Sequence, residues 1–299
     1  MVNTATRGEK IFYSINNVSL VLLAFLCVYP FLHIIATSFS STRAIVSGEV
    51  GMLPVDFNTT AYRNLIEDGQ IFRAFRNTVV VTAAGVSLNM VATIMAAYPL
   101  SKQRLTGRNF YIWFVLFTML FNGGLIPTYL VVRALGLIDS YWSVWFLGLV
   151  STFNLFVMKT FFQGIPQSLE DSASIDGAND IVILIRIFLP LSVPVIATLV
   201  LFYAVGHWNS YMNVLIFIPS PERQTLMVVL QRMILSVQAQ LMESQAGAGA
   251  EGMLELQERL AAEAIRAAAI VIATTPIMLI YPFLQKYFVK GALIGSVKG

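Results

Sequence analysis

Residues 187–221 read IFLPLSVPVIATLVLFYAVGHWNSYMNVLIFIPSP, a run of 35 residues without a single Asp, Glu, Lys or Arg. Crossing the hydrocarbon core of a bilayer, roughly 30 Å thick, takes about 20 apolar residues in a helix. This stretch is therefore long enough for one crossing and too short for a hairpin of two full crossings with a turn. The sequence predicts a membrane-spanning helix here.

Five further stretches lack the same four residue types, at 11–42, 77–101, 109–132, 140–158 and 267–285. The chain is 57% hydrophobic and 12% charged, whereas about a quarter of the residues of a soluble domain are charged. We therefore predict an all-α integral membrane protein with six transmembrane helices. Their approximate bounds are 15–39, 75–101, 108–132, 140–162, 188–217 and 265–286.

The lysines predict the orientation of the chain, because Lys and Arg concentrate in the short cytosolic loops of membrane proteins. All six lysines fall in the termini or in the loops after the second and fourth spans, at positions 10, 102, 159, 286, 290 and 298. We expect both termini and these two loops to be cytosolic. The sequence pI of about 9.0 then reflects topology and not nucleic-acid binding.

Several residues predict interruptions inside the spans. The prolines are Pro30, Pro99, Pro127, Pro194 and Pro276, and a Gly123-Gly124 pair lies in the third span. Such residues are tolerated in a membrane where neighbouring helices or a cavity satisfy the freed backbone groups. Outside the spans we expect a short helix at 61–68 and an amphipathic helix starting near Leu226.

The loop between the fourth and fifth spans, residues 166–190, departs from the lysine-rich pattern of its side. Glu170, Asp171, Asp176 and Asp180 make it locally acidic, which positive-inside sorting does not favour. We infer that this loop has a use. Ser168 and Asp171 fit a capping box that starts a helix, and Asp176-Gly177 fits a helix stop.

Three parts of this loop resemble a known motif: Asp171-Ser172-Ala173, then Ile175-Asp176-Gly177-Ala178, and the distal Ile187-Phe188-Leu189-Pro190. They are similar to the EAA loop of ATP-binding-cassette (ABC) importer permeases, which reads Glu-Ala-Ala, Asp-Gly-Ala and Leu-Pro. Here Asp replaces the Glu and Ser replaces the first Ala. In that family the loop is a coupling helix received by the ATPase subunit. The resemblance implies coupling roles for Glu170, Asp171, Ser172, Ala173, Asp176, Gly177 and Ala178.

The resemblance extends over nearly the whole chain. It includes Ala97-Tyr98-Pro99-Leu100-Ser101, Trp208-Asn209 and the tail from Gln285, which look like the carbohydrate-importer branch. Within that branch the chain is most similar to permeases for oligosaccharides derived from complex polysaccharides, alginate importers among them.

The resemblance implies a single permease domain, 1–299, of the type I importer fold, in the bacterial cytoplasmic membrane. The expected partners are a second homologous permease subunit, two ATPase subunits, an extracytoplasmic solute-binding protein, membrane lipid and a sugar or oligosaccharide. No Gly-Lys-Ser/Thr phosphate loop occurs in the sequence. We therefore expect the chain to bind no cofactor, with ATP and Mg²⁺ used by the separate ATPase.

Polar residues inside the spans are candidates for the translocation path, because they cost free energy unless they are paired or face water. They are Asn122, Asn154, Trp208, Asn209, Tyr211 and Asn213, with His207 a weaker candidate. Hydrogen bonding between helices is the alternative role for each.

Three other functions remain open at this point. An ABC permease for a peptide, an amino acid or phosphate would share the architecture. A secondary transporter would carry intramembrane carboxylates for ion coupling, and the six stretches contain none. An intramembrane enzyme would need a reactive pair or metal ligands at membrane depth. We expect no catalytic residues and no metal site.

Overall fold

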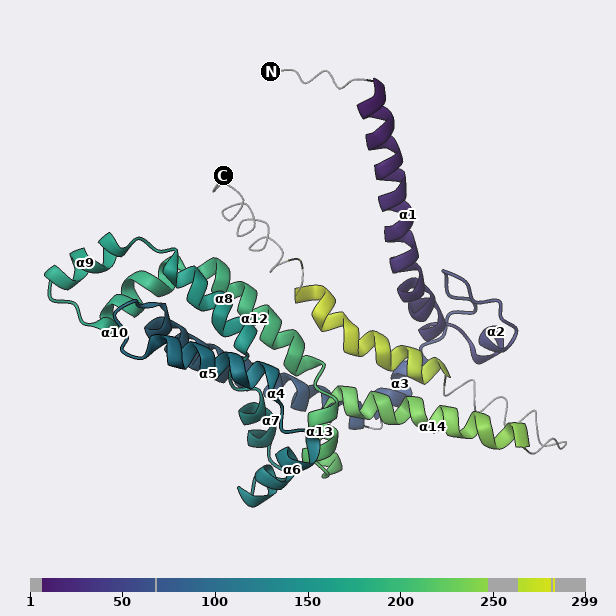
Figure 1. Ribbon diagram of the computed structural model, residues 1–299. Helices are drawn as coiled ribbons and strands as arrows, with labels where there is room; N and C mark the ends of the chain where they lie inside the picture. The colour runs from purple at the N-terminus through teal and green to yellow at the C-terminus, as the bar shows by residue number, and fades with distance from the viewer. Residues whose placement is uncertain (1–6, 68, 247–262, 281, 283–299) are drawn as a thin grey trace. The chain divides into compact units, whose positions relative to one another are not determined.

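The computed structural model describes residues 7–67, 69–246, 263–280 and 282. These residues form helices and connecting loops and contain no strand. The helices are α1 (Arg7–Ser38), α2 (Thr42–Val46), α3 (Thr60–Glu67), α4 (Gln70–Ser101), α5 (Arg108–Leu120), α6 (Leu125–Ala134), α7 (Tyr141–Leu147), α8 (Thr152–Gln163), α9 (Gln167–Ile175), α10 (Asp180–Ile183), the π-helix η1 (Leu184–Phe188), α11 (Leu189–Leu191), α12 (Val193–Trp208), α13 (Met212–Phe217), the 3-10 helix η2 (Pro221–Arg223) and α14 (Leu226–Ala246) (Figure 1). A last helix covers Glu263–Ile280.

Three helices are individually long and apolar enough to cross a membrane: Gly8–Ser38, Gln70–Ser101 and Glu263–Ile280. Three further crossings arise if each bent pair of helices counts as one span. The pairs are α5 with α6, bent by 113°, α7 with α8, bent by 54°, and Asp180–Leu191 with α12, bent by 83°. Length and composition therefore allow up to six spans among the described residues. The tail motif from Gln285 lies outside the described residues.

The predicted interruptions are confirmed at two places. The 113° bend lies at Gly123-Gly124, and the 83° bend lies just before Pro194. In contrast, α1 continues through Pro30 and α4 continues through Pro99. The break between α7 and α8 has no proline and was not expected from the sequence.

The chain divides into two compact units. The first comprises residues 1–71 and 230–274. Within it, the Ser38 hydroxyl lies 2.9 Å from that of Tyr62, and the Tyr62 ring stacks on Phe39 with 4.7 Å between centroids. Burial raises the pKa of Tyr62, because the charged phenolate is disfavoured away from water. The expected short helix at 61–68 is present as α3.

The second unit comprises residues 72–229 and 275–299. Its main core joins α4, α8, α10, the π-helix and α12 through twelve buried residues, Met90, Ala97, Tyr98, Leu100, Leu155, Met158, Phe162, Ile183, Phe188, Val195, Leu199 and Tyr203. A smaller cluster, Val81, Val144, Val214, Ile218 and Val228, joins α4 to α7, α13 and the start of α14. The expected helix from Leu226 is confirmed, and its first residue is fully buried.

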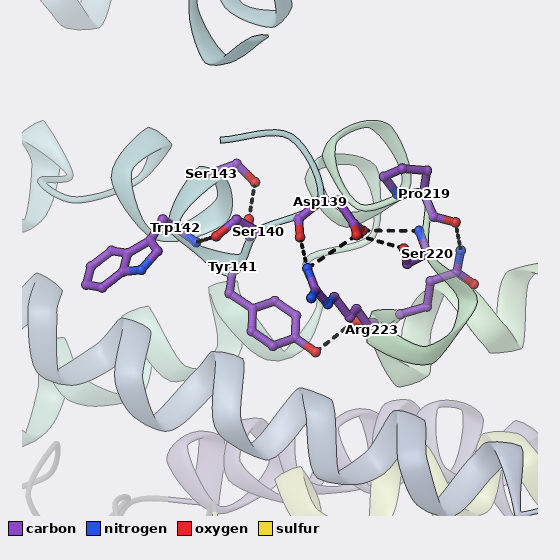
Figure 2. A network of polar contacts seen from close by, with 9 residues as sticks. Asp139, Ser140, Tyr141, Trp142, Ser143, Pro219, Ser220 and Arg223 are labelled. Atoms are coloured by element: carbon purple, nitrogen blue, oxygen red, sulfur yellow. Dashed lines mark hydrogen bonds and ion pairs between the residues drawn. The ribbon is translucent and has the colours of Figure 1, made fainter. Parts of the chain in front are cut away.

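A polar network links residues 139–141 to residues 220–223 in the second unit (Figure 2). Asp139 has a positive φ of 60°, and its carboxylate accepts hydrogen bonds from the backbone N–H of Ser220 at 3.2 Å and from the Ser220 hydroxyl at 2.7 Å. Arg223 pairs with the same carboxylate at 3.2 Å, and Tyr141 donates to the Arg223 carbonyl at 3.0 Å. The loop before α7 is thereby tied to the loop between α13 and α14.

Candidate functional site

The first turn of α9 differs from the prediction. Pro166 occupies the N-cap with φ −58° and makes no side-chain capping hydrogen bond. The helix therefore begins at Gln167, and Ser168 lies inside its first turn, so the predicted capping box is wrong. The physical reason is the ring of Pro166, which holds φ near the helical value and has no N–H to satisfy.

The predicted end of α9 is confirmed. Gly177 has φ +84°, a left-handed conformation that glycine adopts without steric cost. The N–H of Gly177 donates to Ser174 O at 3.1 Å, and the N–H of Ala178 donates to Ala173 O at 3.0 Å. This pair of bonds is a Schellman motif, which satisfies the last carbonyls of the helix and turns the chain sharply.

A four-charge cluster attaches α9 to the end of α4. Glu170 Oε2 lies 2.5 Å from Lys102 Nζ, and Glu170 Oε1 lies 3.3 Å from Arg104. Arg104 also pairs with Asp180, at the start of α10. The side chains of Lys102 and Glu170 are only 11% and 12% exposed. Two cations and two carboxylates thus balance one another where α4, α9 and α10 meet.

Aromatic rings complete the surroundings of Lys102. Its ammonium lies 3.9 Å from the ring centroid of Phe188 and 4.4 Å from that of Tyr98, which is favourable for a cation. Phe188 packs edge-on against Tyr98 and Phe162, with centroid distances of 5.1 and 5.5 Å. The anchor of α9 is therefore built from the core of the second unit.

The helix α9 presents two different faces. Glu170 is buried, and Ala173 and Ala178 pack against the core. The other predicted coupling residues, Asp171, Ser172, Asp176 and Gly177, are exposed. The exposed side also carries an apolar side chain, Ile175, which is 86% exposed. Adjacent residues of a helix point about 100° apart, which separates Glu170 from Asp171.

The predicted path residues are divided among three places. Trp208, Asn209, Tyr211 and Asn213 follow one another at the end of α12 and the start of α13, whereas Asn122 lies at the α5–α6 break and Asn154 in the first turn of α8. Asn154 and Trp208 are buried in this chain, Tyr211 is half-buried, and the other three are exposed. The Asn122 side chain accepts a hydrogen bond from Gly124 N at 2.9 Å. An exposed amide facing lipid would be costly, so the exposed asparagines fit a wet path or a partner chain.

Sequence reasoning missed several residues. Lys102 was read only as a marker of orientation and Arg104 was not singled out, because their pairing with Glu170 joins residues more than 60 positions apart in sequence. Asn89 was not singled out either; its Oδ1 lies 2.6 Å from His207 Nε2, so His207 takes the alternative role of a hydrogen bond between helices. Among the residues described, no group of three or more His, Cys, Asp or Glu side chains is placed to hold a metal ion.

The sequence and the fold are similar to those of known membrane-transport proteins. The family model described as "Binding-protein-dependent transport system inner membrane component" matches residues 89–293. The polygalacturonan/rhamnogalacturonan transport system permease protein YtcP of Bacillus subtilis is 43% identical over 283 residues, covering 94% of this chain and 96% of the relative. Protein LplC of Bacillus subtilis is 40% identical over 295 residues, covering 98% and 97%.

A solved structure is similar over nearly its full length. A chain of a bacterial ABC transporter involved in the import of the acidic polysaccharide alginate superposes with a TM-score of 0.86 at 32% sequence identity, covering 96% of this chain and 100% of that one. The chain described here therefore belongs to the family of binding-protein-dependent transport system inner membrane components, and it is a permease subunit of such a transporter.

Proposed function

We propose that this chain forms half of the membrane path of a sugar or oligosaccharide importer, and that α9 receives movement from a separate ATPase subunit. The observation that carries the coupling role is the division of α9 into two faces. One face is fixed to the core through Glu170, and the other exposes Ile175 beside Asp171 and Asp176. An exposed large apolar residue on a short polar helix suits insertion into a cleft of a partner protein.

The seven coupling candidates then divide into two roles. Asp171, Ser172, Asp176 and Gly177 are available to the ATPase, because they are exposed. Glu170, Ala173 and Ala178 face the core of the permease and would transmit the movement of α9 to it. A rigid connection is needed for this second role, since a helix that slides on its own support transmits no displacement. The Glu170–Lys102 pair at 2.5 Å supplies it.

The complete transporter that we propose contains a second homologous permease subunit, two ATPase subunits and an extracytoplasmic solute-binding protein. The ATPases use ATP and Mg²⁺, and this chain binds neither. The lysines favour an orientation with both termini and α9 in the cytosol. The spans are those predicted at 15–39, 75–101, 108–132, 140–162, 188–217 and 265–286, with the coupling loop at 166–190.

The proposed cargo is a sugar or an oligosaccharide. The names of YtcP and of the alginate transporter support this class. Within this chain, Trp208, Asn209, Tyr211 and Asn213 place aromatic and amide groups close together in sequence, and sugars are bound by aromatic faces and hydrogen-bonding side chains. A peptide, an amino acid or phosphate is the alternative cargo.

The test is reconstitution in liposomes with the partner permease, the ATPases and the binding protein. We expect ATP hydrolysis to rise when the binding protein and oligosaccharides from polygalacturonan are both added, and not with amino acids or phosphate. Gly177→Trp should reduce this stimulated hydrolysis to the level without binding protein, because the bulky side chain would project from an exposed turn into the proposed contact with the ATPase. Gly48→Trp is the matched control, because Gly48 also has a positive φ, of 70°, with open space around it.

Full stimulation and uptake with Gly177→Trp in an intact complex would refute coupling through α9. Stimulation by an amino acid or by phosphate alone would refute the sugar assignment while leaving the coupling role in place.

A further inference from the structure

The break between α7 and α8 leaves backbone groups without helical partners. Helix α7 ends at Leu147, and α8 begins at Thr152 after a bend of 54°. In the low-dielectric interior of a membrane, each unsatisfied carbonyl or N–H costs several kcal/mol. Two side chains from α4 and two from α12 lie around this break. They form two layers of hydrogen bonds that reach its backbone carbonyl and N–H groups.

The first layer is formed by Asn89 and His207. The amide nitrogen of Asn89 donates to Gly148 O at 2.5 Å and to Leu149 O at 2.9 Å. Its oxygen therefore faces His207 Nε2, at 2.6 Å, and this nitrogen must carry the hydrogen. One asparagine thus binds two carbonyls of the break and one side chain of α12.

The second layer is formed by Thr93 and Tyr203. The Tyr203 hydroxyl accepts a hydrogen bond from Ser151 N at 3.1 Å and lies 2.7 Å from the Thr93 hydroxyl. Thr93 and Tyr203 are both buried. The same three elements, α4, the break and α12, therefore meet a second time.

The two layers are one helical turn apart. Asn89 and Thr93 are separated by four residues on α4, as are Tyr203 and His207 on α12, and residues four apart share a helix face. One turn before Asn89, a Cβ on Gly85 would lie 2.5 Å from the His207 ring. A side chain at position 85 would therefore force the His207 ring to move from its place beside Asn89.

Helix α8 connects this break to α9. It packs on α4 and α12 through Leu155, Met158 and Phe162, and three residues separate its end from the start of α9. One end of α8 is therefore joined to the exposed coupling helix, and the other is held by the two layers of hydrogen bonds.

We propose that Asn89, Thr93, Tyr203 and His207, here named the two-rung clamp, are positioning residues for transport: they fix the α7–α8 break as the pivot about which α8 turns when α9 is moved. This inference rests on the proposed coupling role of α9. A hinge that is hydrogen-bonded at two levels can change its bend without losing its place between α4 and α12. The angle between α7 and α8 then differs between the inward-open and outward-open states of the transporter, whereas the break keeps its position.

The first test measures the bend directly. Cys27→Ala removes the native thiol, and spin labels are attached through Phe146→Cys on α7 and Thr160→Cys on α8, both at exposed positions. In the reconstituted complex we expect the distance between the labels to differ between the nucleotide-free and the ATP-trapped state. An unchanged distance in a complex that hydrolyses ATP would overturn the pivot while leaving coupling through α9 intact. A complex without stimulated hydrolysis would instead refute the proposed function, and the pivot with it.

The second test separates the clamp from general stability. Thr93→Val keeps the shape but removes the hydroxyl, whereas Thr93→Ser keeps the hydroxyl. We expect Thr93→Val to retain assembly and basal ATP hydrolysis and to transport several-fold less sugar per ATP, and Thr93→Ser to remain close to wild type. Equal sugar per ATP in the wild type and Thr93→Val, or an equal loss in both variants, would overturn the proposal.

Gly85→Ala offers an independent variant of the first rung. The added methyl displaces the His207 ring from Asn89, so we expect the same loss of transport per ATP. Gly206→Ala is the matched control on α12, because nothing lies within 4 Å of a Cβ there. If the two alanine variants transported equally, the first rung would have no role in positioning.

Discussion

Glu170→Gln is expected to lower the free energy of unfolding of this chain by about 3 kcal/mol, because it leaves the Lys102 ammonium without its carboxylate in a nearly buried position. Lys102 and Glu170 are 2.5 Å apart, with side chains only 11% and 12% exposed. The rings of Tyr98 and Phe188 retain part of the favourable surroundings of the cation, so the loss falls at the lower end of the range for buried ion pairs. Denaturant titration in detergent micelles measures it.

Two controls separate this effect from a general loss of charge. Glu67→Gln removes the carboxylate of the Arg63–Glu67 pair, whose side chains are 78% and 64% exposed, and should change stability by less than about 0.5 kcal/mol. Adding Lys102→Met to Glu170→Gln should recover much of the loss, since the unpaired cation is then gone. A Glu170→Gln chain as stable as the wild type would contradict the anchor.

Gly124→Ala is expected to cost about 1 to 3 kcal/mol of stability, because Gly124 occupies a backbone region that is essentially restricted to glycine. Its φ is 83° and its ψ is 175°, at the 113° bend between α5 and α6. Its carbonyl accepts from Thr128, from the N–H at 3.3 Å and from the hydroxyl at 2.7 Å. Relaxing the strain would therefore shift the start of α6.

Gly123→Ala provides the comparison for this prediction. Gly123 does not have a positive φ, and the nearest atom to a Cβ there is Pro127 Cβ at 3.9 Å. We expect it to change the free energy of unfolding by less than about 0.5 kcal/mol. Equal losses for the two variants in the same micelle titration would show that the backbone conformation of Gly124 is not what matters.

The spans and two of the three breaks could be predicted from sequence because their signals are local. An uncharged run of sufficient length marks a span, and Gly123-Gly124 and Pro194 directly weaken a helix. The break at Gly148–Ser151 has no such signal beyond one glycine. It is held by Asn89, Thr93, Tyr203 and His207, which lie more than 50 residues away in sequence. Such a break depends on tertiary contacts, which the local sequence around it does not predict.

The coupling loop was recognised as a unit, but its inner arrangement was not. Glu170 and Asp171 are neighbours of the same charge, and the sequence assigned them one role. The structure turns Glu170 toward Lys102 and leaves Asp171 exposed, as the 100° step of a helix requires. The end of α9 at Gly177 was predictable, because it depends on the conformational freedom of that one glycine. The start of α9 was not, because Pro166 and not Ser168 occupies the N-cap.

If the exposed face of α9 docks into the ATPase, Ile175→Asp should break that contact. Ile175 is 86% exposed, so the change should leave the fold of this chain intact. Leu53→Asp is the matched control, at a residue that is 76% exposed outside the predicted coupling loop. The measurement is the amount of ATPase subunit that co-purifies with each variant from detergent-solubilised membranes. We expect wild-type recovery with Leu53→Asp and loss of the ATPase with Ile175→Asp. Full recovery of the ATPase with Ile175→Asp would show that the exposed face of α9 is not the docking surface.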